Sequence, residues 1–445
     1  MRKFYLLALM AMVAISCHRE VEVIDPMPSP SEDVTAETTP LNVRTYDEAL
    51  AIAEEALQMV DGEDTRSADR RRIMRNSGQV VSLPVTRGGE DVGEQPIMYV
   101  FNNENNEGFT VVAADRSQQA LVAVTERGNY TYGEPTGVEP FDDFMDNAIS
   151  TLSIIGPPSL PNPPIIDSLD SSPISYTVYY NEDQMVGPLL KTKWGQRGLY
   201  GAYCDNGLAG CTATAVGQVM AYHKHPAYLE LTFSSNDVIF YFNWDRMLTH
   251  VQGTTCSCTA PHDQIGLFLR EIGERMDMAY DPNSSGAFLS AANDAFPSMG
   301  YKTGVYRTFN DINTLYGSVK SNLNDSLPVC MTGYREVLKN GHTWVIDGYH
   351  HYKNGYAVYS RNVIVDPEVP TVGQYILEEY NVEEYELLHF NWGWNGSCDG
   401  WFNVGCYKMN QAYDGRYDNS NVTNSSTNDY KYDLSILYNI EPDED

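Results

Sequence analysis

A run of small and apolar residues follows Cys211 with the spacing of a buried helix. The run extends from Cys211 to His223, directly after Gly210, and Pro226 ends it. Because the first N–H groups of a helix have no partner within it, a thiol at this position lies in a positive field that favours its thiolate. The sequence therefore predicts a helix that begins at a candidate nucleophile.

The composition narrows the class of protein. The chain has 445 residues, enough for two or three domains, and 42% of them are hydrophobic. Its 29 basic and 60 acidic residues give a formal net charge of −31. Nucleic-acid binding requires a basic surface, so we expect no nucleic-acid partner.

The first 17 residues have the pattern of a bacterial export signal. Arg2 and Lys3 precede an apolar run, Phe4–Ile15, that is too short to span a bilayer comfortably. The run ends just before Cys17 in a sequence that resembles a lipobox, in which the cysteine is lipidated. We expect residues 1–17 to be a signal peptide and Cys17 to be the lipidation site, with ordinary signal cleavage as the alternative.

Either alternative exports the protein. The expected localisation is the cell surface or outer membrane as a lipoprotein, or the exterior as a secreted protein after processing. No second long apolar segment follows, so the only membrane association that we expect is through a lipid anchor.

Composition also divides the rest of the chain. Residues 18–41 are rich in Pro, Glu, Ser and Thr and are predicted to be a flexible tether. Residues 42–155 carry the patterns of a small α+β domain. Residues 156–187 open with a proline-rich stretch and are predicted to be a linker, and residues 188–445 form a larger domain.

Local patterns predict the elements of both domains. A capping box at Thr45 and Glu48 begins an amphipathic helix. The predicted strands of the small domain are Met98–Phe101, Phe109–Ala113 and Leu121–Val124, and a second helix is marked by residues from Phe141 to Ile155. The larger domain is predicted to contain a helix at Gln264–Met278, strands at Trp344–Ile346 and Val358–Val365, and a surface loop at Asn410–Tyr430.

One histidine suits the candidate nucleophile. His223 and His225 lie three turns or more along the Cys211 helix and rise away from its start. His350 and His351 occur in polar sequence that is typical of a loop. His342 follows a glycine and precedes a β-prone run that would hold it rigidly, so it is the candidate base.

Two further side chains complete a candidate site. An asparagine amide can accept the ring N–H of a histidine and fix its tautomer, and Asn391 is the candidate, with Trp392 shielding this bond from water. Gln196 lies upstream of the nucleophile and can donate, together with the Cys211 backbone N–H, to an oxyanion.

The eight cysteines do not form a metal-binding pattern. Cys256 and Cys258 are too close for a zinc ribbon, and no partners follow at ligand spacing. Besides Cys17 and Cys211, six cysteines remain that an exported protein can pair, and their connectivity stays open. We expect no metal and no cofactor.

The order of these motifs resembles that of the streptopain family of papain-like cysteine peptidases. The residues that carry the resemblance are Gln196, Gly210-Cys211, Ala213-Thr214-Ala215, Tyr222–Pro226, Tyr280–Ala287, Gly341-His342 and Asn391–Trp394. It covers about 190–440, and Gly108–Asp115 resembles the inhibitory propeptide of the same family.

The resemblance implies an α+β fold, with a papain-like peptidase domain of two subdomains preceded by a small α+β propeptide domain. It also implies a zymogen. Residues 42–155 would cover the cleft as an intramolecular inhibitor, and proteolysis within or just after the linker would release them. The expected activity is that of a cysteine endopeptidase that hydrolyses proteins or peptides through an acyl-enzyme.

The resemblance also assigns roles. Cys211 is the nucleophile and His342 the general base and acid. Asn391 orients His342, and Gln196 helps to form the oxyanion hole. The residues expected at the substrate-binding cleft are Gly341 and Trp392.

One departure from the family pattern is the spacing of 49 residues between His342 and Asn391. An insertion around His350–Leu388 is expected to reshape the cleft. Two alternatives from other classes are a catalytically inactive surface binding or inhibitor lipoprotein on the same scaffold, and an acyl transferase of transglutaminase type with a Cys-His-Asp triad. Asp347 follows His342 too closely along one strand to turn back easily onto its ring.

Overall fold

The computed structural model describes most of the chain between residues 43 and 443. The described residues are 43–61, 71–74, 77–87, 90–155, 175–233, 236–248, 260–336, 339–362, 374–406 and 432–443. No helix within these ranges is both long and apolar enough to cross a membrane. The predicted signal peptide, lipidation site, tether and surface loop at 410–430 lie outside the described residues.

Helix α1 (Tyr46–Asp61) begins at the predicted capping box. The backbone N–H of Thr45 donates to Oε2 of Glu48 at 2.7 Å, and the N–H of Glu48 donates to Oγ1 of Thr45 at 3.3 Å. The apolar side of α1, which includes the buried Ala53 and Leu57, packs on strands β3 (Phe109–Ala113) and β4 (Leu121–Thr125). The prediction for this helix is confirmed.

The predicted hairpin and third strand are also present. Strand β2 (Glu90–Asn102) pairs antiparallel with β3 (Phe109–Ala113), and β3 pairs with β4 (Leu121–Thr125). Side chains alternate between the two faces of β3. Val111 belongs to the core under helix α2 (Glu139–Leu152), whereas Val112 belongs to the core under α1.

The remaining elements of this region are β1 (Gln79–Arg87), η1 (Glu104–Asn106), α2 (Glu139–Leu152) and β5 (Ile154–Ile155). Helix α2 ends three residues earlier than predicted, since Ile155 pairs in parallel with Arg87 of β1 instead of extending the helix.

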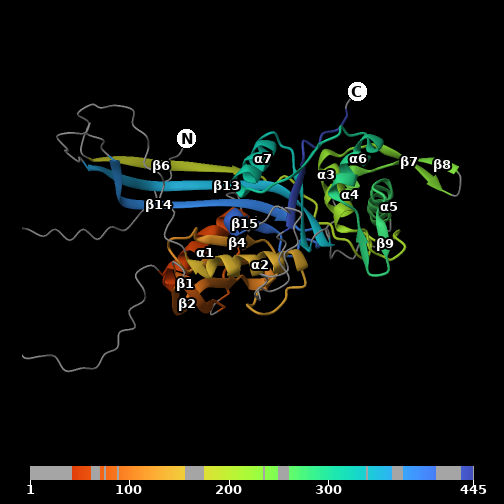
Figure 1. The fold of residues 1–445 in the computed structure, drawn as a ribbon. Helices are drawn as coiled ribbons and strands as arrows, with labels where there is room; N and C mark the ends of the chain where they lie inside the picture. The colour runs from red at the N-terminus through yellow and green to blue at the C-terminus, as the bar shows by residue number, and fades with distance from the viewer. Residues whose placement is uncertain are drawn as a thin grey trace, which may run out of the picture. The chain divides into compact units, whose positions relative to one another are not determined.

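A second group of strands forms the sheet of the larger domain (Figure 1). They are β6 (Ser175–Val186), β11 (Val305–Thr308), β12 (Val329–Glu336), β13 (Lys339–Asn362), β14 (Gln374–Asn391), β15 (Gly400–Asn403) and β16 (Tyr432–Tyr438). Strand β13 pairs with β12 near its start and with β6 and β14 along the rest of its length.

The long β13 corrects two predictions. It joins the two strand-like runs that begin at Trp344 and Val358 into one strand, and it contains His350 and His351, which were expected in a loop. Each of these two imidazoles contacts a carboxylate on β6 through its Nε2. His350 Nε2, for example, lies 2.9 Å from Oδ1 of Asp183 on β6. Strand β6 itself forms within the predicted linker 156–187.

Helices form the other subdomain of the larger domain (Figure 1). They are α3 (Cys211–His223), α4 (Trp244–Leu248), α5 (Ala260–Arg275), α6 (Leu289–Ala295) and η2 (Phe296–Met299), with the hairpins β7 (Tyr228–Phe233)–β8 (Asn236–Tyr241) and β9 (Ala279–Asp281)–β10 (Ser284–Gly286). Helix α5 overlaps the predicted range Gln264–Met278, but it begins four residues earlier and ends three residues earlier than predicted. Helix α7 (Ile312–Asn324) and η3 (Val404–Cys406) pack with the sheet instead.

Helix α3 lies between α5 and β13. It has almost no exposed side because its small residues allow close packing. A Cβ added at Gly217 would lie 2.6 Å from Cδ2 of Leu269 on α5. The central helix thereby joins the helical subdomain to the sheet that carries His342.

The two domains share one sheet. Strand β4 of the N-terminal domain pairs antiparallel with β15 of the larger domain, with Trp401 opposite Val124 and Phe402 opposite Ala123. The continuous order is β11-β16-β12-β13-β14-β15-β4-β3-β2-β1-β5.

Phe402 is the centre of an aromatic cluster that contains side chains of both domains. Its ring centroid lies 4.9 Å from that of Phe144 on α2 and 5.2 Å from those of Phe390 and Trp392. The side chain is fully buried.

We predict that Phe402→Ala lowers the free energy of unfolding of the full chain by about 3–5 kcal/mol, because it leaves a cavity between the two domains. Denaturant unfolding of the precursor measures this change. Phe288→Ala is the matched control, since Phe288 is 52% exposed, and it should change the free energy little. An equal change in both variants would contradict the prediction.

Candidate active site

Cys211 is the first residue of α3, as predicted. Gly210 precedes it with a φ of 90°, a conformation that favours glycine, and a Cβ there would lie 2.5 Å from Sδ of Met278. The backbone N–H of Ala209 donates to the carbonyl of Gln196 at 2.8 Å. This bond holds the segment that carries Gln196 next to the start of the helix.

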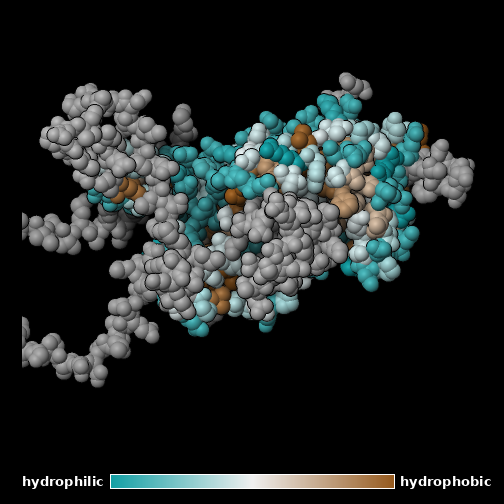
Figure 2. Space-filling view, viewed as in Figure 1, coloured by the Kyte–Doolittle hydropathy of each residue, from teal (hydrophilic) through white to brown (hydrophobic). Residues whose placement is uncertain are grey.

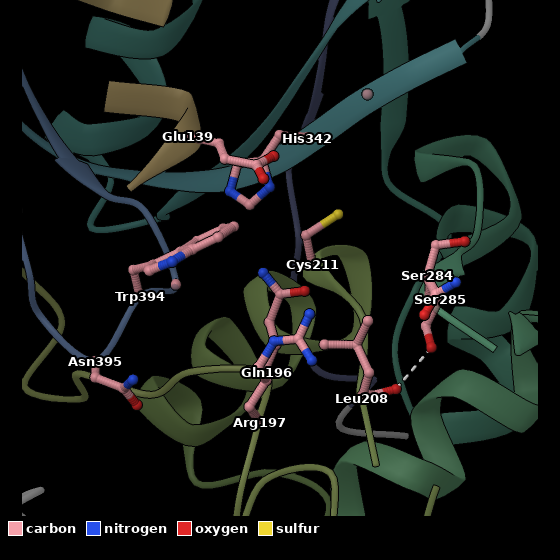
Figure 3. A pocket seen from close by; sticks show the side chains of 13 residues that line it. Glu139, Gln196, Arg197, Leu208, Cys211, Ser284, Ser285, His342, Trp394 and Asn395 are labelled. Atoms are coloured by element: carbon pink, nitrogen blue, oxygen red, sulfur yellow. Dashed lines mark hydrogen bonds between the residues drawn. The ribbon is translucent and has the colours of Figure 1, made fainter. Parts of the chain in front are cut away.

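A cavity of about 250 Å³ opens at Cys211 (Figure 3). Four of the residues predicted for the site line it, namely Gln196, Cys211, Gly341 and His342. A second cavity of about 340 Å³ shares Cys211 and Gly341 and continues past Thr343 and Tyr334. Residues scattered over the sequence thus meet at one hollow, and Gly341 lies where the two cavities join.

His342 is held at one ring nitrogen. Its Nε2 lies 2.9 Å from the backbone carbonyl oxygen of Trp392. Because a carbonyl oxygen only accepts, Nε2 carries the proton and donates. The ring stacks with Trp344 at 6.2 Å between centroids and meets the edge of Trp394 at 5.0 Å. These contacts fix the imidazole at the wall of the cavity.

The group that accepts from Nε2 differs from the expected one. The side chain of Asn391 bonds elsewhere: Nδ2 donates to the carbonyl of Thr192 at 2.8 Å, and Oδ1 accepts from Nε2 of Gln218 at 2.9 Å. Oδ1 also accepts from the N–H of Gly393 at 3.2 Å. Asn391 therefore fixes the backbone on both sides of Trp392, whose carbonyl meets His342.

Trp392 does not line either cavity. Its side chain is fully buried, and its indole N–H donates to the carbonyl of Cys398 at 2.9 Å. The tryptophan that faces the cavity is Trp394. Trp392 and Trp394 follow Asn391 by one and three residues. The chain bends after Trp392, so that Trp394 rather than Trp392 faces the cavity.

The thiol of Cys211 does not have the lowered pKa that the sequence led us to expect. Burial raises its pKa, and hydrogen bonds with Thr343 and Thr212 only partly oppose this. In Figure 3 the sulfur is turned away from the imidazole of His342. The full-length chain thus holds the two groups at one cavity, with the pKa of the thiol raised.

Glu139 is a cavity residue that sequence reasoning missed. It is the first residue of α2, so it comes from the N-terminal domain, yet it lines the same cavity as Cys211 and His342 (Figure 3). The pairing of β4 with β15 brings the start of α2 to the cavity, and no local sequence pattern predicts this pairing.

The other candidate partners lie away from the cavity. Asp347 contacts Nδ1 of His389 at 2.6 Å, which agrees with the expectation that it does not reach His342. His223 and His225 contact Tyr301 and Gly300. Within the described ranges, no residue of the insertion His350–Leu388 lines the two cavities, since it forms the ribbon of β13 and β14.

The cysteines and acidic residues form no metal site in the described part of the chain. The cysteines with free thiols there are Cys204, Cys211, Cys330, Cys398 and Cys406. Cys256 and Cys258 lie outside the described residues.

Asp399 supports the turn that holds His342. Its Oδ1 accepts from the backbone N–H of Trp392 at 2.9 Å, and its side chain is fully buried. Burial raises the pKa of Asp399 to about 7. When the pKa of a carboxyl group is higher in the folded than in the unfolded chain, the free energy of unfolding falls as pH rises from the unfolded pKa to the folded pKa. For Asp399 this range is from about 4 to about 7.

We predict that Asp399→Asn stabilises the chain relative to the parent increasingly as pH rises from 4 to 7, by at most about 1.4 kcal/mol per pH unit. Denaturant unfolding of the precursor at several pH values measures the difference. Asp294→Asn, at an exposed position on α6, is the control and should show no such trend. A difference that stays constant over this range would contradict the prediction.

The chain matches known protein families in two separate regions. Residues 194–402 match the Peptidase C10 family, and residues 35–149 match the Spi protease inhibitor. Streptopain from Streptococcus pyogenes is 25% identical over 369 residues, which cover 76% of this chain and 81% of streptopain. The thiol protease/hemagglutinin PrtT of Porphyromonas gingivalis is 22% identical over 78% of this chain and 37% of its own length.

Among solved structures, a prointerpain A fragment from Prevotella intermedia is 18% identical, with a TM-score of 0.48 over 81% of this chain and 98% of the fragment. The two family matches together take in most of the chain and divide it as the fold does. The chain is therefore a streptopain-like cysteine peptidase of the C10 family, made as a zymogen with an N-terminal inhibitory domain.

Proposed function

We propose that the peptidase hydrolyses peptide bonds with Cys211 as nucleophile and His342 as general base and acid. The observation that carries this assignment is that the two side chains, from α3 and β13, line one cavity. The thiolate attacks the scissile carbonyl, and His342 gives its proton to the leaving amine. A water molecule then releases the acyl group, with His342 as the base.

Gln196 is proposed to stabilise the oxyanion together with the backbone N–H of Cys211. Gln196 lines the same cavity, and Cys211 supplies an N–H at the start of α3. Asn391 is proposed to orient His342 indirectly, by fixing the backbone around the Trp392 carbonyl. Gly341 leaves room for a substrate backbone, and Trp394 takes the position that was expected for Trp392.

Latency is proposed to follow from the N-terminal domain. Glu139 lies in the cavity, and the pKa of the Cys211 thiol is raised. Removing this domain admits water and substrate and lets the sulfur turn toward His342, whose positive charge then lowers the pKa of the thiol. The proposed boundaries are 42–155 for the inhibitory domain, 156–187 for the segment that is cleaved, and 188–445 for the peptidase.

Export is a further part of the proposal. Residues 1–17 are proposed to direct secretion, Cys17 to carry a lipid anchor, and residues 18–41 to tether the protein to the surface. The substrates are proteins or peptides, and the resulting enzyme is an endopeptidase that works without a cofactor.

Trypsin-like proteolysis of the purified precursor tests the catalytic assignment. We expect a mass decrease, the appearance of casein hydrolysis, and labelling of Cys211 by a peptidyl epoxide, all together. Cys211→Ala should abolish hydrolysis and labelling after the same cleavage, whereas the control Cys204→Ala, at a buried free thiol, should retain both. Full activity of processed Cys211→Ala would overturn the assignment.

A second variant tests the oxyanion role. Gln196→Ala should lower kcat of the processed enzyme about 10²–10³-fold with little change in KM, because an oxyanion donor acts in the transition state. Gln184→Ala, at an exposed position on β6, is the control. A rise in KM with unchanged kcat would assign Gln196 to substrate binding instead.

A further inference from the structure

A cluster of charged side chains joins the inhibitory domain to the peptidase domain away from the catalytic cavity. Glu126 directly follows β4 of the inhibitory domain. Its Oε1 lies 3.2 Å from Nε2 of His389 on β14, and its Oε2 forms an ion pair with Nζ of Lys193. The other ring nitrogen of His389 lies 2.6 Å from Oδ1 of Asp347.

We propose that His389 and Lys193 form a carboxylate-binding site on the peptidase domain, and that Glu126 is the ligand through which the inhibitory domain docks. This inference rests on the proposed function, in which the inhibitory domain is released on activation. The partner that the site fits is an extended strand that pairs with the edge of β15 and is followed directly by a residue with a carboxylate side chain.

Burial makes this site more than a surface ion pair. The side chain of His389 is 5% exposed and that of Glu126 is 16% exposed. Both ring nitrogens of His389 face a carboxylate, which requires an imidazolium. Burial alone would lower the pKa of His389, but Asp347 and Glu126 outweigh it and raise the pKa to about 10. The same contacts, with Lys193, hold the pKa of Glu126 well below its usual range, against the effect of burial.

The main chain fixes the register in which Glu126 arrives. Its backbone N–H donates to the carbonyl of Asp399 at 2.8 Å, and the N–H of Cys398 donates to the carbonyl of Arg127 at 3.0 Å. These bonds extend the ladder of β4 with β15. A carboxylate one residue past the end of β4 is thereby placed against His389.

The site is complete on the peptidase side without Glu126. Asp347 stays paired with His389, and its Oδ2 accepts from the backbone N–H of Leu190 at 2.9 Å. Release of the inhibitory domain therefore leaves a paired imidazolium rather than an isolated buried charge. This arrangement suits a ligand that binds and then departs.

The charges around Glu126 set the direction of a pH effect. They are His389, Lys193, Asp347 and Asp399, together with Arg71, whose Nη2 donates to the backbone carbonyl of Glu126 at 3.5 Å. Because the pKa of Glu126 is lower when docked than when free, its contribution to docking is complete above the ordinary glutamate pKa of about 4.3 and is lost as pH falls below it.

Amide hydrogen exchange in the full-length Cys211→Ala chain tests the proposal without any need for catalysis. Glu126→Gln should lower the protection of amides in 121–127 and 398–403 about ten- to a hundredfold at pH 6, because a buried charged hydrogen bond is lost. The ratio between parent and variant should shrink toward one as pH falls to 3.

Matched variants separate this site from general destabilisation. Glu104→Gln changes an exposed glutamate of the same domain and should leave the exchange unchanged. Lys193→Met should reproduce part of the effect, and the double variant with Glu126→Gln should add little to Glu126→Gln alone. Protection of β13 and β12 should persist in all four variants, which shows that the peptidase domain is folded.

Two results would overturn the proposal. One is equal protection of 121–127 and 398–403 in the Glu126→Gln variant and its parent. The other is additive effects of Glu126→Gln and Lys193→Met, because independent groups do not share a site. Neither result bears on the catalytic roles of Cys211 and His342, which the activity assays test separately.

Discussion

The backbone pairing of β4 with β15 is the interaction on which the arrangement of the precursor depends. It makes one sheet out of two domains and brings the aromatic rings of α2 onto Phe402. It also sets the position of Glu139 at the cavity that Cys211 and His342 line, and of Glu126 at His389. The proposed inhibition and the proposed docking therefore depend on a single strand register. Among the residues that Figure 2 colours by hydropathy, most are hydrophilic and a minority are hydrophobic.

The short turn after β14 contacts His342 and is itself held in place by buried side chains. Asn391 and Asp399 hold its backbone, and the carbonyl between them receives His342. All of these groups are buried, so each depends on the others to satisfy its hydrogen bonds. The ring of His342 is thus oriented by the main chain, and the side chains of Asn391 and Asp399 act on that main chain.

Much of the fold was predictable because its signals are local. The capping box of α1, the β2–β3 hairpin and the start of α3 at Cys211 follow from capping, alternation and helix spacing. The meeting of Gln196, Cys211 and His342 needed the family resemblance. The partners of Asn391, the exchange of Trp392 for Trp394, and Glu139 depend on contacts between distant segments, which periodicity does not contain. The sequence around His350 and His351 resembles a loop because both faces of their β-ribbon carry polar residues.

Strand β6 has a consequence for the enzyme after its inhibitor has left. It runs antiparallel to β13, with Val186 opposite Tyr349 and Ser175 opposite Ser360. A cut before Ser175 leaves the ribbon three strands wide and puts the new chain start at its far end, remote from the thiol. A cut after Val186 strips one strand away and bares an edge of β13 that can recruit another chain. The choice of scissile bond therefore decides whether this edge of β13 stays paired with β6 or becomes free to pair with another chain.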